Sequence, residues 1–310
     1  MTHDEKKRIV AAARQYMADH NISQNKLKEL SGVTYLPFML TSEEFKYKNA
    51  QSGEMCDIPE KWFVLLAQTI GYSVTSEAWP MVVNDQVIEM LRELEEAKAT
   101  ATMRILIGST GCGKTYIAER FKLKNPAGTY LVTCHRFDRL DDLIDKIMAA
   151  TGIKCEERRT SRRLERLRVE LWRRHRNGER LMLIFDESEN LTIHTLQMLK
   201  ALYDFLKTGC SIVLIGTDQL TNKLEALRRK NTTGIPQLYR RFKAGIRYLK
   251  EVDTSFDAFF AGKDVATDAK RILRNMCDNY GELADYLEPA LRAANGQPVT
   301  AELLRTLYKL

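Results

Sequence analysis

The sequence predicts an α/β fold in which a five-stranded parallel sheet lies between an N-terminal all-α domain and a C-terminal helical part. In the middle of the chain, short apolar runs rich in β-branched residues alternate with helical patterns, which is typical of a parallel sheet with crossover helices. The residues before and after this region show helical patterning alone. The predicted strands are residues 103–107, 130–134, 181–185, 212–215 and 246–249.

These patterns divide the chain into four parts. We expect a helical, helix-turn-helix-like domain over residues 1–78, and a linker with a leading helix over residues 79–101. A nucleotide-binding core follows over residues 102–253, and a helical lid subdomain over residues 254–310. Trp79 and Pro80 mark the linker, because proline disfavours continued helix.

Composition places the chain among ordinary globular proteins. Its 310 residues are 44% hydrophobic, and no run reaches the roughly 18 apolar residues that a membrane helix needs. The N-terminus enters an amphipathic pattern without an apolar signal core, so we expect a cytoplasmic protein without a membrane partner. The six cysteines include no C-x-x-C pair, which argues against a zinc site. A net charge of +7 suggests a polyanionic partner.

The N-terminal residues resemble the repressor-like helix-turn-helix. A helix over residues 5–20 precedes a short helix over 24–30, a turn at Gly32 and a third helical segment over about 34–44. Pro37 falls where the reading helix should continue. A small helical interaction domain without a nucleic-acid role is the alternative.

A glycine-rich loop between the first predicted strand and a helix has the spacing G-x-x-x-x-G-K-T. Loops of this kind direct backbone amides and a helix N-terminus at the phosphates of a nucleotide, here ATP. Lys114 should contact the β- and γ-phosphates, and the Thr115 hydroxyl should reach Mg²⁺. The predicted ATP-binding residues of the loop are Gly108, Ser109, Thr110, Gly111, Cys112, Gly113, Lys114, Thr115 and Tyr116.

Two adjacent acids end the apolar strand at residues 181–185. Ligands of parallel sheets bind at the carboxyl ends of the strands, so both acids should lie beside the loop. We expect Asp186 to complete the Mg²⁺ site with Thr115 and to contribute to ATP binding. Glu187 is placed to orient the water that attacks the γ-phosphate.

A polar residue also follows the strand at residues 212–215. Thr217 is a candidate to sense the γ-phosphate or to hold the attacking water. Threonine is equally common as the cap of a following helix, so both interpretations remain open.

Together these motifs resemble those of the AAA+ ATPases over residues 85–310. In that family, an arginine near the last strand reaches the γ-phosphate bound by a neighbouring subunit. The resemblance implies that Arg241, or else Arg240, has this catalytic role. The family often carries a lid arginine as well. Here Ala284 stands where it would fall, which leaves Arg292 as a substitute.

A basic segment over residues 154–180 precedes the Asp-Glu pair. Leu164, Leu167 and Leu171 would bury one stripe of a helix. Guanidinium groups crowded near a helix N-terminus oppose its dipole, which favours an external anion such as DNA phosphate. A solvated face with local Glu-Arg pairs is the alternative. The predicted DNA-binding residues are Arg158, Arg159, Arg162, Arg163 and Arg166.

The order of these parts, the chain length and the arginine-rich segment are similar to the DNA-transposition ATPases, the group of the phage Mu B protein and related transposon helper ATPases. The resemblance implies a slow ATPase that forms ATP-dependent homo-oligomers, as rings or helical filaments, on double-stranded DNA. It also implies that the ATPase recruits or activates a transposase and that hydrolysis drives disassembly. A helicase or replication-initiator loader, and a nucleotide-switched helix-turn-helix regulator, are the alternatives.

Overall fold

The computed structural model describes residues 1, 3–19, 22–42, 44–48, 53–70, 72, 82–206 and 209–310. The chain divides into two compact units, Met1–Pro80 and Met81–Leu310, and each is described by itself. The linker expected at Trp79 and Pro80 lies outside the described residues. Among the helices that the structure describes, none is long and apolar enough to cross a membrane.

The N-terminal unit has a hydrophobic core of its own. Ile9 of α1, Leu27 of α2 and Phe63 of α4 are fully buried in it. Each of these helices therefore turns one apolar stripe inward. The described elements of this unit are α1 (His3–Asp19), α2 (Gln24–Ser31), α3 (Leu36–Thr41), β1 (Lys46–Lys48), β2 (Met55–Asp57) and α4 (Glu60–Ile70).

α2, a glycine turn and α3 follow one another in the expected order. Ser23 caps α2 by accepting a hydrogen bond from the Lys26 amide at 3.2 Å, and Gly32 ends the helix with φ +66°. α3 is short and begins at Leu36, so Pro37 lies in its first turn instead of interrupting it. A proline costs little there, because the N–H that it lacks would have no partner inside the helix.

The expectation of an all-α N-terminal domain needs one correction. β1 pairs antiparallel with β2, with Tyr47 opposite Cys56. Each strand is only three residues long. Such short strands have too little alternation to be recognised in a sequence. The DNA-reading role of the helix-turn-helix stays a prediction.

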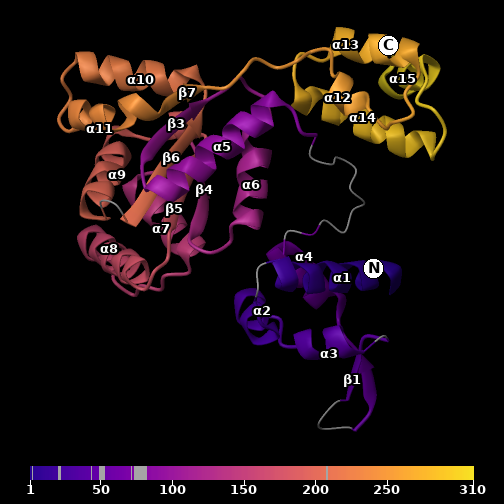
Figure 1. Cartoon of the computed structure of the whole chain (residues 1–310), viewed down its shortest axis with the longest axis horizontal. Coiled ribbons are helices and arrows are strands. Elements are labelled where there is room, and N and C mark those ends of the chain that lie inside the picture. The colour runs from indigo at the N-terminus through magenta and orange to yellow at the C-terminus, as the bar shows by residue number, and fades with distance from the viewer. Residues whose placement is uncertain are drawn as a thin grey trace. The chain divides into compact units, whose positions relative to one another are not determined.

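The second unit contains the parallel sheet and its helices, followed by the helical lid (Figure 1). Its elements are α5 (Asp85–Thr100), β3 (Met103–Ile107), α6 (Lys114–Lys124), β4 (Thr129–Thr133), α7 (Leu140–Thr151), α8 (Thr160–Arg176), β5 (Leu181–Asp186), η1 (Ser188–Asn190), α9 (Ile193–Leu206), β6 (Cys210–Gly216), α10 (Asp218–Arg229), α11 (Ile235–Phe242), η3 (Lys243–Gly245), β7 (Ile246–Tyr248), α12 (Asp257–Phe260), α13 (Thr267–Met276), α14 (Tyr280–Ala294) and α15 (Ala301–Tyr308).

The five-stranded parallel sheet predicted from the sequence is confirmed. Its strand order is β4-β5-β6-β3-β7, and every neighbouring pair is parallel. β6 therefore lies between β3 and β5: Ile107 pairs with Gly216, and Phe185 pairs with Leu214. This order brings the carboxyl ends of the three strands that carry the predicted site residues next to one another.

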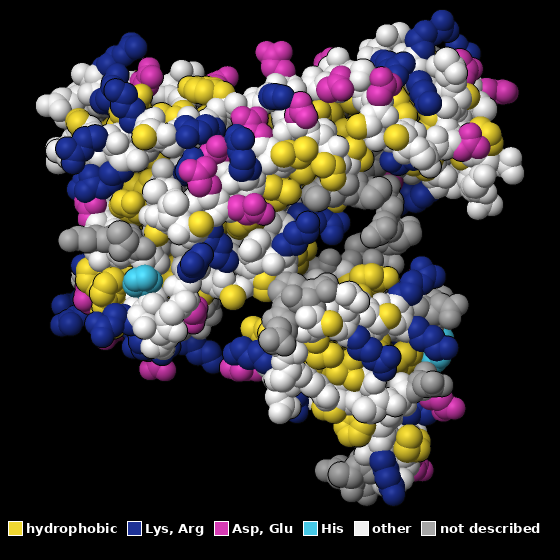
Figure 2. Space-filling model, viewed as in Figure 1, with side chains coloured by type: hydrophobic (Ala, Val, Ile, Leu, Met, Phe, Trp, Pro, Cys, Tyr) yellow, Lys and Arg dark blue, Asp and Glu magenta, His cyan; other side chains and the backbone are white. Residues whose placement is uncertain are grey.

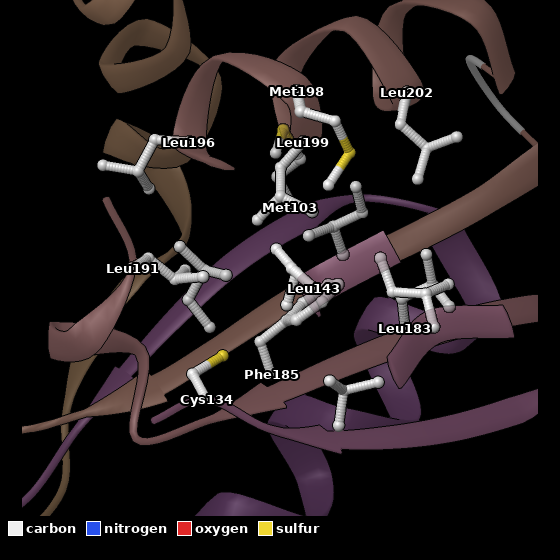
Figure 3. Close-up of a cluster of buried hydrophobic side chains, with 14 of the residues drawn as sticks. Met103, Cys134, Leu143, Leu183, Phe185, Leu191, Leu196, Met198, Leu199 and Leu202 are labelled. Atoms are coloured by element: carbon white, nitrogen blue, oxygen red, sulfur yellow. The ribbon is translucent and has the colours of Figure 1, made fainter. Parts of the chain in front are cut away.

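Helices cover both faces of this sheet, and successive residues of each strand point to opposite faces. On one face, Leu183 and Phe185 of β5 pack under Leu196, Leu199 and Leu202 of α9, which point toward the sheet (Figure 3). The opposite face packs against α5 and α6 with other residues of the same strands, among them Met182, Ile184, Val213 and Ile215. Strand residues on both faces are buried, which explains why the strands read as continuous apolar runs.

A buried charge network fastens the leading helix α5 to the sheet. Arg104 of β3 forms ion pairs with Glu93 and Glu96 of α5, and Arg247 of β7 approaches Glu93 at 3.3 Å. The side chains of Arg104 and Glu93 are only 7% and 4% exposed. Removing one partner of such a pair leaves the other charged and buried.

We therefore predict that Arg104→Ala lowers the free energy of unfolding by about 3–5 kcal/mol, as expected for breaking a buried ion pair. Denaturant unfolding monitored by circular dichroism measures this loss. Arg92→Ala is the matched control. Arg92 also approaches Glu93, at 3.7 Å, but its side chain is 69% exposed, so its loss should cost at most about 1 kcal/mol. Equal losses in the two variants would contradict the role of burial.

Candidate functional site

The loop after β3 has a backbone that only glycine adopts easily. Gly111 and Gly113 have φ values of +72° and +89°, in the left-handed region that other residues avoid. Gly113 directly precedes α6, so the loop leads into the positive end of a helix. Gly108 and Cys112 are buried, and Ser109 and Thr110 are exposed at the crest of the loop.

The Lys114 side chain folds back against this loop. Its ammonium donates hydrogen bonds to the Gly108 and Ser109 carbonyls at 2.9 and 2.7 Å. The charge is therefore held inside the loop, where the phosphates of a nucleotide would lie. Tyr116, two residues further on, contacts Arg120, whose guanidinium lies 5.0 Å from the centre of the ring.

A hydrogen bond joins the loop to the Asp-Glu pair. The Thr115 hydroxyl donates to Asp186 Oδ2 at 2.5 Å, and the Asp186 residue is 2% exposed. A hydroxyl and a carboxylate are the hard oxygen ligands that Mg²⁺ prefers. The predicted metal residues therefore lie together and fit the ion.

Glu187 has a strained backbone. Its φ of +52° is unusual for a residue with a side chain, and such strain is often concentrated at functional sites. The carboxylate is exposed, and Asn190 donates to its Oε2 at 3.3 Å and to the Cys134 carbonyl at 3.0 Å. Sequence reasoning missed Asn190, although it follows Glu187 by only three residues.

Thr217 follows β6, between the strands of the loop and of the Asp-Glu pair. It occupies the N-cap position of α10, but its side chain makes no capping hydrogen bond. Its hydroxyl donates instead to Glu189 Oε1 at 3.1 Å. The side-chain capping interpretation is therefore wrong, and the sensing role stays a prediction. Glu189 is a further acid at this edge, and its buried Oε2 has no hydrogen-bond partner among the described residues.

The structure separates the two candidate arginines by their contacts. Arg241 of α11 forms an ion pair with Asp204 of α9 at 2.5 Å and donates to the Gln237 carbonyl. Burial raises the pKa of Asp204, but the bonds from Lys200 and Arg241 outweigh this effect and leave the pKa below its usual value. Arg240 is exposed and has no side-chain hydrogen bond or ion pair to any described residue. Of the two, Arg240 is thus more available to a second subunit.

Residues Thr160–Arg176 of the basic segment form α8, and its Leu167 and Leu171 are fully buried, as predicted. Leu164 is partly buried against the same core. Local Glu-Arg pairs do form on this helix, for example between Arg168 and Glu165. Figure 2 shows Lys and Arg side chains gathered at the end of the central domain where α8 lies. The predicted residues that are exposed and form no salt bridge with a described residue are Arg158, Arg159, Arg162 and Arg166.

The prediction that Arg163 binds DNA is wrong. This residue is only 9% exposed, and its guanidinium bonds to Asp141 and Asp145 of α7. It therefore anchors α8 to α7, and its guanidinium does not face solvent. The helix turns by about 100° per residue, so adjacent arginines point in different directions.

A loop after β4 adds an exposed aromatic residue that sequence reasoning also missed. Phe137 is 89% exposed, between the exposed Arg136 and the pinned Asp138. Asp138 accepts hydrogen bonds from the His135 amide at 2.7 Å and from Lys146 at 2.6 Å. The loop is therefore held in shape while its apolar tip faces solvent.

The lid touches the glycine loop at one turn. The Gly281 amide, in the first turn of α14, donates to the Gly111 carbonyl at 3.1 Å. Arg292 lies roughly 16 Å further along the same helix at 1.5 Å per residue, where it pairs with Glu288. The structure therefore does not bring Arg292 to the loop.

Comparison with known proteins finds a family model that matches part of this unit. Residues 97–224 match the family model described as an AAA domain. A comparison with curated proteins gave no match.

Solved structures share the fold of about three quarters of this chain. The chain is 18% identical to Cdc6p from Pyrobaculum aerophilum, with a TM-score of 0.55, over 74% of this chain and 72% of that one. It is 16% identical to the Orc1 protein of Aeropyrum pernix, solved in complex with DNA, with a TM-score of 0.55, over 75% of this chain and 66% of that one. At these identities the likeness shows the fold alone.

Proposed function

We propose that this protein is an ATP-dependent, DNA-binding ATPase that assembles into homo-oligomers on DNA and recruits or activates a transposase, with hydrolysis driving disassembly. The observation that carries the ATPase proposal is the convergence of Lys114, Thr115, Asp186 and Glu187 at one edge of the sheet. The AAA domain match supports it. The choice of a transposase as partner rests on the resemblance in domain order and motifs described above.

Each residue has a definite task in this proposal. Lys114 binds the β- and γ-phosphates, and Thr115 and Asp186 hold Mg²⁺, which supplies positive charge to the phosphates. Glu187 accepts a hydrogen bond from the attacking water and aims it at the γ-phosphate. The contact from Asn190 restrains that carboxylate before the water arrives.

We predict that Glu187→Gln reduces ATP hydrolysis at least about 100-fold, because an amide is a poor acceptor for the water proton. ATP binding should persist, so DNA-bound oligomers formed with ATP should outlast those of the wild type in electron micrographs. Glu119→Gln, at an exposed position on α6, should behave like the wild type. Unchanged DNA binding by a dimer, with or without ATP, would instead support a nucleotide-switched regulator.

The oligomer proposal needs a residue that one subunit gives to the next. Arg240 is exposed at the end of α11 without a described partner, and a free guanidinium suits the developing charge on a transferred phosphoryl group. Arg241 is held by Asp204, so it would have to exchange partners first.

We predict that Arg240→Ala inactivates hydrolysis and that mixing it with Glu187→Gln restores part of the activity. In a mixed head-to-tail oligomer, about a quarter of the interfaces combine an intact Glu187 with an intact Arg240 from the neighbour. Steady-state phosphate release measures the recovery. Arg241→Ala, mixed in the same way, is the control that separates the two arginines. No recovery in either mixture would contradict a shared site.

The charged face of α8 supports DNA as the polyanion. Arg162 and Arg166 of α8 are exposed, and so are Arg158 and Arg159 just before it. Lys and Arg contacts to phosphate dominate sequence-independent DNA binding. Arg136 and Phe137 combine a cation with an exposed aromatic ring, which suits contact with nucleic acid. The Orc1 structure of similar fold was solved in complex with DNA.

We predict that replacing Arg158, Arg159, Arg162 and Arg166 with Gln weakens DNA binding equally for unrelated sequences. It should also flatten the plot of log affinity against log salt by about 0.9 for each DNA phosphate that the variant no longer neutralises. Fluorescence anisotropy at several salt concentrations measures the slope. Arg163→Gln is the control: it should lower thermal stability, because Arg163 anchors α8, and leave the slope unchanged. An unchanged slope in the fourfold variant would refute this surface.

A further inference from the structure

The first turn of α14 contacts the glycine loop at Gly111. The Gly281 amide bonds to the Gly111 carbonyl at 3.1 Å. The side chain of Asn279 packs beside it: a methyl group added to Gly111 would lie 2.1 Å from Asn279 Oδ1. The lid therefore contacts the loop through both a hydrogen bond and close packing.

Asn279 is itself held firmly. Its Oδ1 accepts a hydrogen bond from the Glu282 amide at 3.0 Å, and its Nδ2 donates to Glu282 Oε1 at 2.7 Å. The neighbouring Tyr280 is 8% exposed, and its hydroxyl accepts a hydrogen bond from the Asp253 amide in the connection between core and lid. The turn that meets the loop is thus tied to its own helix and to the core.

This contact fixes the direction of an amide in the loop. The Gly111 carbonyl and the Cys112 N–H belong to one trans peptide plane, so they point in opposite directions. Since the carbonyl points toward the lid, the Cys112 N–H points to the opposite side, where it donates a long hydrogen bond to the Ser109 carbonyl, with 3.4 Å between nitrogen and oxygen. Amides inside such a loop are the groups that bind phosphate.

We propose that Asn279 and Gly281 are positioning residues for the nucleotide. They hold the peptide between Gly111 and Cys112 so that its N–H stays on the side away from the lid, where a phosphate oxygen can replace the long hydrogen bond to Ser109. They also restrain the lid over the bound nucleotide. A lid arginine would act on the phosphates directly, and this chain has Ala284 at the corresponding place. The proposal rests on nucleotide binding by the loop, but not on DNA or a transposase.

Two variants of the full chain test this role. Asn279→Ala and Thr300→Ala each remove the side chain that caps a lid helix, since Thr300 accepts from the Leu303 amide at 3.2 Å. Each loss should cost about 1 kcal/mol of stability. Only Asn279 touches the loop, so the pair separates the loop contact from general lid stability. The measurements are release of a fluorescent ADP analogue by stopped flow, and KM and kcat for ATP.

We expect Asn279→Ala to release the analogue about tenfold faster, equivalent to about 1.4 kcal/mol, with a raised KM and a retained kcat at saturating ATP. Thr300→Ala should stay within about twofold of the wild type, a difference of about 0.4 kcal/mol. Asn279→Ser keeps a capping oxygen but is too short to pack on Gly111. It should release the analogue faster while melting like the wild type, and it carries the test if Asn279→Ala does not fold.

Unchanged release from both Asn279 variants would overturn the proposal, and so would equal acceleration in Asn279→Ala and Thr300→Ala. Absence of hydrolysis by the wild type with DNA and Mg²⁺ would contradict the proposed ATPase alone. The release rates would then still decide whether Asn279 positions the loop.

Discussion

The site depends on the hydrogen bond between the Thr115 hydroxyl and Asp186. Thr115 lies in the helix that follows β3, and Asp186 ends β5. These two strands are not neighbours, because β6 lies between them. The bond can form only if the three strands end at the same edge and keep their register. Close apolar packing on both faces supplies that rigidity, since side chains of β5 such as Leu183 and Met182 are buried on opposite sides.

The turn η1 extends this arrangement to the rest of the edge. Glu189 accepts a hydrogen bond from Thr217 after β6, and Asn190 reaches the Cys134 carbonyl after β4. Lys223 of α10 donates to the Glu189 and Leu191 carbonyls. A displacement of Glu187 would therefore shift residues on both sides of β5 and in α10. These hydrogen bonds form one contiguous set of contacts along the edge of the sheet.

The sequence was sufficient for features that consecutive residues define. The glycine loop and the Asp-Glu pair are local motifs, and strands buried on both faces read as apolar runs. Features that depend on contacts between residues far apart in the chain could not be predicted from the sequence. Arg163 is next to Arg162 in the chain, yet it is buried because Asp141 and Asp145 lie on a neighbouring helix. The contact of Gly281 with Gly111 joins residues far apart in the chain, so no local sequence pattern predicts it.

The burial of Cys112, at 2% exposed, gives the molecule a practical property. The described cysteines also include Cys134 and Cys210, whose pKa values burial raises to about 12, and only thiolates react readily with alkylating dyes. Cys56 and Cys155 are the partly exposed thiols, and they belong to different units of the chain. A donor and an acceptor dye would attach there first, leaving the glycine loop unmodified. Energy transfer between them would then measure the distance between the two units in solution.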